Sequence, residues 1–262
     1  MDLGLNGQIA LVTGASSGLG YACAGSLLEE GARIAITGSH EGRITAAAEA
    51  LSTDSTRVTG AVLDLTRPDH PRTVVDAVTR HFGAPPDTLV VSTGGPPSGT
   101  FDTLDDDAWE RGIDLVLRGL VRTVRACLPG MRESNRGRIV VITSIAAKEP
   151  IDALLVSSAL RAGVHGLVNA LAREVGPDGI TINAVMPGYT RTERLIELAD
   201  RWAAQRNTTP EAIIKTLADD SPIRRICEPA ELAATVSFLC SDQAAAINGV
   251  ALPVDGGALR SI

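Results

Sequence analysis

The chain has 262 residues, of which 44% are hydrophobic, and a net charge of −7. This length suits one large core, and an acidic chain without a basic run argues against a nucleic-acid partner. No apolar run approaches the ~20 residues of a transmembrane helix, so we expect no membrane span. Four scattered cysteines and four histidines without ligand spacing predict reduced thiols, a cytoplasmic location and no metal site.

Short apolar, β-branched segments alternate with helix-length stretches from one end of the chain to the other. This alternation predicts βαβ units, and therefore an α/β fold of the doubly wound Rossmann type, with a parallel sheet and helices on both faces. No repeat or long linker interrupts it, so we expect a single domain over residues 1–262. The predicted strands are Ile9–Thr13, Arg33–Thr37, Arg57–Leu63, Leu89–Ser92, Arg138–Thr143, Thr181–Met186 and Ala251–Val254.

The first predicted strand runs directly into a glycine-rich turn, and a helix follows to about Glu30. Gly14 permits a tight turn, Gly18 lets the backbone approach a phosphate, and Gly20 lets the helix pack closely on the strand. The helix N-terminus offers unpaired N–H groups and a positive dipole end. The pattern in this context predicts a dinucleotide-binding site.

Three later segments are helical in pattern. Leu104–Leu128 and Ala153–Val175 flank the fifth predicted strand. Residues 192–221 follow the carboxyl end of the sixth strand, where α/β sheets bind ligands, and we interpret them as a substrate lid. The alternative is a structural insertion. Arginines in this segment, such as Arg194 and Arg201, together with Trp202, would suit an anionic or partly apolar ligand.

Motifs along nearly the whole chain resemble the short-chain dehydrogenase/reductase family, and in particular its 3-oxoacyl-acyl-carrier-protein reductases. They are the Thr13–Gly20 turn, Asn183 followed by Pro187-Gly188-Tyr189-Thr190-Arg191-Thr192, and the closing Val254-Asp255-Gly256-Gly257. The resemblance implies a nicotinamide-dependent oxidoreductase with a small-molecule substrate. Because this family packs its two long central helices against a neighbouring subunit, it also implies a homo-oligomer, a dimer or tetramer.

The resemblance also implies a set of cofactor contacts. The second predicted strand ends without the acid that commonly binds the NAD ribose, because no acid occurs before Glu41. Ser39, His40 and Arg43 could bind the 2′-phosphate of NADP instead, so NADP is favoured and NAD stays open. The implied cofactor-binding residues are Gly14, Ser16, Ser17, Gly18, Leu19, Gly20, Ser39, Asp64, Leu65, Thr93, Gly94, Pro187, Gly188, Thr190 and Thr192.

At the catalytic positions the chain departs from the family. Ser144 matches the family serine, but Ser157 stands at the tyrosine, Arg161 at the lysine and Val116 at the asparagine. A serine is a much poorer acid than a phenol, and arginine does not pass a proton on. We therefore expect Ser144, Ser157 and Arg161 to form an atypical catalytic group that binds a carbonyl or an anion.

Other roles remain open for these and neighbouring residues. Arg161 could instead form a salt bridge with Asp152 or Glu149, and Tyr189 or Lys148 could replace the missing proton donor. The function predicted first is NAD(P)-dependent oxidoreduction of a carbonyl or hydroxyl compound. The alternatives are a dinucleotide-binding module without turnover, and a non-redox enzyme that carries out elimination or cyclisation.

Overall fold

The computed structural model describes residues 2–261, which build one seven-stranded sheet in the order β3-β2-β1-β4-β5-β6-β7. Every neighbouring pair of strands is parallel. The predicted α/β doubly wound fold is confirmed, and most strand limits lie within one residue of the prediction. The strands are β1 Ile9–Val12, β2 Arg33–Gly38, β3 Val58–Val62, β4 Thr88–Val91, β5 Gly137–Ile142, β6 Ile180–Pro187 and β7 Ala251–Val254.

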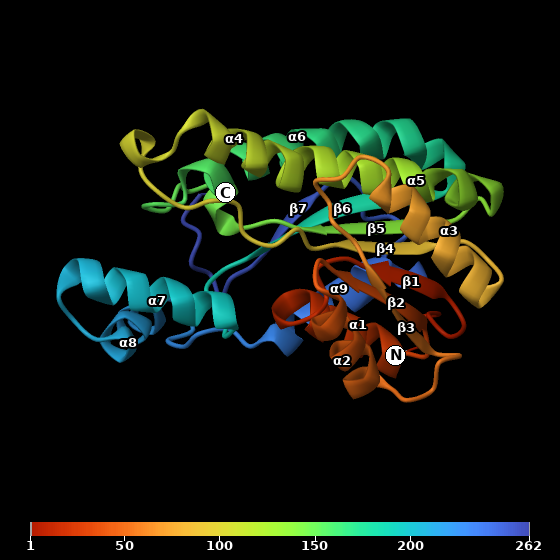
Figure 1. Cartoon of the computed structure of the whole chain (residues 1–262), viewed down its shortest axis with the longest axis horizontal. Helices are drawn as coiled ribbons and strands as arrows, with labels where there is room; N and C mark the ends of the chain where they lie inside the picture. The colour runs from red at the N-terminus through yellow and green to blue at the C-terminus, as the bar shows by residue number, and fades with distance from the viewer. Residues whose placement is uncertain (1, 262) are drawn as a thin grey trace.

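Helices cover both faces of this sheet (Figure 1). On one face α1, α2 and α9 pack over a core that includes Val12 and Ile36, and on the other α3, α5 and α6 pack over a core that includes Leu11 and Val91. Successive strand residues thus bury opposite faces, as the two-residue period of a strand requires. The helices are α1 Gly18–Glu29, α2 Glu41–Leu51, α3 His70–Phe82, α4 Asp106–Gly112, α5 Gly119–Glu133, α6 Leu155–Val175, α7 Glu193–Arg206, α8 Pro210–Asp220 and α9 Pro229–Cys240.

The three predicted helical segments differ from the structure in their limits. The segment predicted at Leu104–Leu128 consists of α4, a π-helical stretch Ile113–Arg118 and α5. Its start is set by Asp105, whose side chain accepts a hydrogen bond from the N–H of Ala108 as a helix cap. Helix α6 begins after Ala153, because that residue has φ +61°, in the left-handed region.

The segment 192–221 forms two helices, α7 and α8, which extend from the sheet at one end of the molecule (Figure 1). Asn207, at φ +51°, ends α7, and Thr209 caps α8 by accepting from the N–H of Ala212. The two helices bury Trp202 and Ile213 in a small core of their own, which Tyr189 joins at its edge.

Within residues 2–261 no helix is both long and apolar enough to cross a membrane. The same residues contain no group of three His, Cys, Asp or Glu side chains placed to hold a metal ion. All four cysteines are buried free thiols.

Candidate functional site

A cavity of about 520 Å³ opens where β1, β4, β5 and β6 end, beside the point at which the strand order reverses. Ligands bind at this position in open parallel sheets. The glycine-rich turn, the loop after β4, the end of β5, α6 and the start of α7 all contribute to its wall. The predicted site residues that line it are Gly14, Ser17, Gly18, Leu19, Thr93, Gly94, Ser144, Ser157, Arg161, Pro187, Gly188, Thr190 and Thr192.

The glycine-rich turn has the shape that a dinucleotide phosphate requires. Gly14 has φ +58°, and a Cβ there would lie 2.4 Å from the Ser92 carbonyl oxygen. A Cβ on Gly20 would lie 2.4 Å from the carbonyl oxygen of Gly14, so both glycines are required by packing. Gly18, at φ +60°, faces the cavity, and Ser17 precedes α1 without capping it through its side chain. The first N–H groups of α1 therefore remain available to a phosphate.

The remaining predicted cofactor residues lie outside the lining of the cavity: Gly20 under the turn, and Ser16, Ser39, Asp64 and Leu65 on its β2–β3 side. Ser39 is exposed at the end of β2. The carboxylate of Asp64 accepts hydrogen bonds from the N–H and the hydroxyl of Thr66, at 2.9 and 2.7 Å, which lower the pKa of this carboxyl group. The cofactor roles of these residues stay predictions.

A basic side chain also reaches the turn. Arg43, in α2, lies with Nη2 3.4 Å from Ser17 Oγ and 3.5 Å from Glu193 Oε2, and it lines the cavity. Its side chain and that of Glu193 are more than half exposed, so the ion pair is weak. A phosphate bound beside Ser17 would therefore meet a guanidinium that Glu193 neutralises only weakly.

Arg161 is buried at the wall of the cavity and bonds to no carboxylate of residues 2–261. It is 8% exposed, and its Nε donates to Ser157 Oγ at 3.2 Å. Nη1 and Nη2 donate to the carbonyl oxygens of Ile142 and Gly94, each at 2.9 Å. The alternative of a salt bridge is thus wrong for this structure: Glu149, for example, accepts from the N–H groups of residues 260 and 261 instead.

Burial is the main reason that the pKa of Arg161 falls to about 10, with a smaller contribution from the charge of Arg194. The group therefore keeps its proton at neutral pH. A buried charge without a counter-charge is expensive unless it is well hydrogen-bonded, and here main-chain carbonyls fill that role. The wall of the cavity consequently carries a fixed positive charge.

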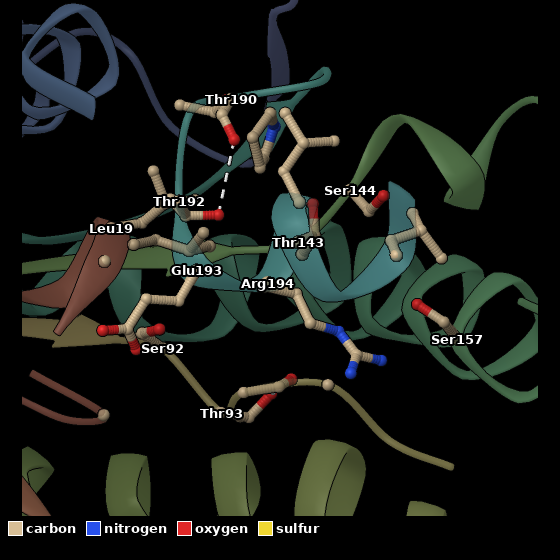
Figure 2. A pocket seen from close by; sticks show the side chains of 18 of the residues that line it. Leu19, Ser92, Thr93, Thr143, Ser144, Ser157, Thr190, Thr192, Glu193 and Arg194 are labelled. Carbon is tan, nitrogen blue, oxygen red and sulfur yellow. Dashed lines mark hydrogen bonds between the residues drawn. The ribbon is translucent and has the colours of Figure 1, made fainter. Parts of the chain in front are cut away.

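Two serine hydroxyls lie at this end of the cavity (Figure 2). Ser157 Oγ accepts from Arg161, and Ser144 Oγ accepts from the N–H of Ala146 at 3.1 Å. Within the described chain neither hydroxyl proton has an acceptor. Both protons are therefore free to be donated to the oxygen of a ligand, next to the charge of Arg161.

The other candidate proton donors fit less well. Tyr189 lines the cavity, but its ring packs edge-on against Trp202 at 6.3 Å and burial raises the pKa of its hydroxyl, which makes it a weaker acid. Lys148 is not part of the cavity lining and lies near His165. Val116 is buried in the core beside β4 and β5.

Several apolar residues of the cavity wall were not among the residues predicted from the sequence. Ile142 and Ile145 flank Ser144, and Ile151 and Leu154 precede α6. The first two could have been inferred from their place at the carboxyl end of a predicted strand. The other two belong to a loop whose path depends on the left-handed Ala153, for which the sequence carries no signal.

Comparison with known proteins adds independent information. A family model described as enoyl-(acyl carrier protein) reductase matches residues 14–258. A 3-oxoacyl-acyl-carrier-protein reductase from Pseudomonas aeruginosa is 34% identical over 260 residues, which cover 99% of this chain and 100% of that protein.

Solved structures are similar over the same length. L-sorbose reductase from Gluconobacter frateurii, in complex with NADPH and L-sorbose, has a TM-score of 0.94 and 32% identity, covering 100% of both chains. A variant of actinorhodin polyketide ketoreductase with NADPH has a TM-score of 0.93 and 31% identity, covering 97% of this chain and 98% of that one. These similarities, together with the family match, show that the chain belongs to the short-chain dehydrogenase/reductase family.

Proposed function

We propose that this protein is an NADP-dependent oxidoreductase that interconverts a carbonyl compound and its alcohol at an atypical site made by Ser144, Ser157 and Arg161. The observation that carries the proposal is the bond from the buried Arg161 guanidinium to Ser157 Oγ in the wall of the cavity. Ser144 lines the same cavity, and neither serine proton has an acceptor within the described chain, which supports a role for both hydroxyls beside the charge of Arg161.

The cofactor assignment rests on the turn and on Arg43. Gly18 and the first N–H groups of α1 would hold the pyrophosphate, and Arg43 with Ser17 would hold the 2′-phosphate. Similar structures solved with NADPH support the same assignment. When bound, the nicotinamide supplies the hydride for reduction, or accepts it in the reverse direction.

The chain's own residues act on the substrate oxygen. As the carbonyl carbon gains a hydride, the π electrons of the C=O bond move to the oxygen, which becomes an alkoxide. Ser144 and Ser157 donate hydrogen bonds to that oxygen, and the charge of Arg161 stabilises it. Serine and arginine are weak proton donors at neutral pH, so the alkoxide takes its final proton from bulk solvent after the hydride transfer.

We propose further that α7 and α8 form a lid within a single domain that spans residues 1–262. Arg201, in α7, donates to Ser98 Oγ at 2.8 Å and so joins this segment to the loop after β4. A lid that closes over bound substrate excludes water from the reacting groups.

The protein is also proposed to act as a homo-oligomer, a dimer or tetramer, in the cytoplasm. Helix α6 leaves Ala159, Ala162, Gly163 and Gly166 exposed, a small-residue surface on which another helix can pack closely. The buried free thiols suit a reducing compartment. Gel filtration with light scattering tests the assembly.

The proposal is tested by titrating the protein with NADPH and NADH and then following NADPH absorbance with a panel of ketones, aldehydes and oxo acids. We expect saturable NADPH binding and turnover that persists in Tyr189→Phe but falls in Ser144→Ala and Arg161→Ala. Binding without oxidation across the panel would instead indicate a dinucleotide-binding module. Product formation without a change in absorbance would indicate non-redox chemistry.

A further inference from the structure

A second guanidinium enters the cavity from the lid. Arg194 lies in the first turn of α7, and its side chain crosses the cavity toward the end where Ser157 lies (Figure 2). The guanidinium packs on Gly95, where a Cβ would lie only 3.0 Å from Nη2. The absence of a side chain at residue 95 thus leaves the space that Arg194 occupies.

The charges around the cavity leave this end positive. Glu193 pairs with Arg43 at the other end, beside Ser17. Glu197 is the carboxylate nearest Arg194 in the described chain, at 3.4 Å from Nη1, and its side chain is 64% exposed to water, so it neutralises Arg194 only weakly. Among the described residues, the partners of Arg161 are two main-chain carbonyls and the Ser157 hydroxyl, none of which carries a negative charge.

The pyrophosphate of a cofactor is not the natural partner of Arg194. Phosphates bind at the glycine-rich turn and the start of α1, where Leu19 lies. In Figure 2 Leu19 and Ser92 lie on one side of the cavity, whereas the Arg194 guanidinium points to the other side, toward Ser157. An anionic group bound by Arg194 would therefore belong to the substrate and not to the cofactor.

We propose that the substrate carries a carboxylate near its reacting carbonyl or hydroxyl group, and that Arg194 binds this carboxylate while Ser144, Ser157 and Arg161 hold the reacting oxygen. The substrate class is thus a small oxo acid or hydroxy acid, and this inference rests on the proposed oxidoreduction. Arginine binds a carboxylate through two parallel hydrogen bonds, which also fixes the orientation of the substrate. Leu154 and Leu198 provide an apolar wall for its carbon chain.

The test compares acids with neutral partners of the same shape. Reduction of 2-oxobutyrate and 3-oxobutyrate is measured against their methyl esters in the presence of NADPH, for the wild type, Arg194→Gln, Arg194→Lys and Arg191→Gln. The last variant is the matched control, since it removes an arginine charge three residues away that pairs with Glu228 at 2.9 Å and does not line the cavity. Calorimetry of each 2- or 3-hydroxy acid binding to the NADP-loaded protein gives a readout that does not depend on turnover.

We expect the wild type to prefer one acid over its ester by at least about tenfold in kcat/KM, the effect of one charged hydrogen bond. Arg194→Gln should abolish this preference mainly through KM, Arg194→Lys should restore part of it, and Arg191→Gln should keep it. Acid binding that depends on Arg194 in calorimetry, without reduction of any compound, would support the carboxylate site and refute the oxidoreduction. Esters reduced as well as acids would overturn the carboxylate site and leave the oxidoreduction standing. Weaker NADPH binding in Arg194→Gln with unchanged acid preference would also overturn it, in favour of a cofactor contact.

Discussion

Replacing Arg161 by glutamine should nearly abolish turnover while leaving the protein folded. The side chain donates three hydrogen bonds, to Ser157, Ile142 and Gly94. At roughly 1.5 kcal/mol for each bond from a charged donor, their loss amounts to roughly 5 kcal/mol. The burial that lowers the pKa of this group to about 10 costs about 3 kcal/mol at neutral pH, and that cost disappears with the charge.

The net loss of stability in Arg161→Gln is therefore about 2 kcal/mol, which corresponds to a Tm lower by about 4–8 °C in a protein of this size. The expected loss of catalysis is larger. Removal of one preorganised charge or donor from the site of a developing oxyanion lowers kcat by about 100- to 1000-fold. Arg161→Lys keeps the charge and should recover part of this rate.

The assay measures kcat/KM for the best carbonyl substrate, the Tm, and the dissociation constant for NADPH in each variant. A folded Arg161→Gln variant that binds NADPH and turns over at close to the wild-type rate would refute the electrostatic role. In that case Arg161 would only connect the loop after β4 to the end of β5. A large loss of NADPH binding alone would assign the residue to the cofactor.

Three further predictions follow from particular contacts. Gly14→Ala should lower the free energy of unfolding by more than about 1 kcal/mol and abolish NADPH binding, because φ +58° disfavours alanine and its Cβ would meet the Ser92 carbonyl. Thermal melts and a fluorescence titration with NADPH measure the two effects. Arg43→Gln should weaken NADPH binding by about tenfold or more and leave NADH binding unchanged, since only NADPH carries the 2′-phosphate; equal losses would contradict that assignment. Burial lowers the pKa of His165. As the pH falls below about 6.5, the unfolded chain therefore takes up a proton before the folded protein does, and the Tm should decrease. In His165→Gln the Tm should depend less on pH over the same range.

The fold could be predicted from the sequence because its signals are local. The strand Ile9–Val12 is apolar and short, the glycines at 14, 18 and 20 have fixed backbone roles, and the alternation with helices repeats to the end of the chain. Helix limits were less predictable. Ala153 adopts a left-handed conformation without a sequence signal, and the break between α7 and α8 combines the left-handed Asn207 with the Thr209 cap.

The candidate catalytic residues could be chosen from the sequence, whereas their contacts could not, and their catalytic roles stay predictions. Ser144, Ser157 and Arg161 were identified from their place in the chain, and all three line the cavity. Arg161, however, bonds to Gly94, 67 residues earlier in the chain, and such a partner appears only when β4 and β5 lie side by side. The same holds for Arg194, whose position against Gly95 depends on how α7 lies beside the loop after β4.

The most direct test of the account is transfer of deuterium from NADPH labelled at the reactive nicotinamide carbon to a carbonyl substrate. The account predicts that the wild type forms an alcohol with deuterium on the former carbonyl carbon, and that Ser157→Ala and Arg161→Gln form it far more slowly. Saturable NADPH binding with no deuterated alcohol from any member of the substrate panel would contradict it.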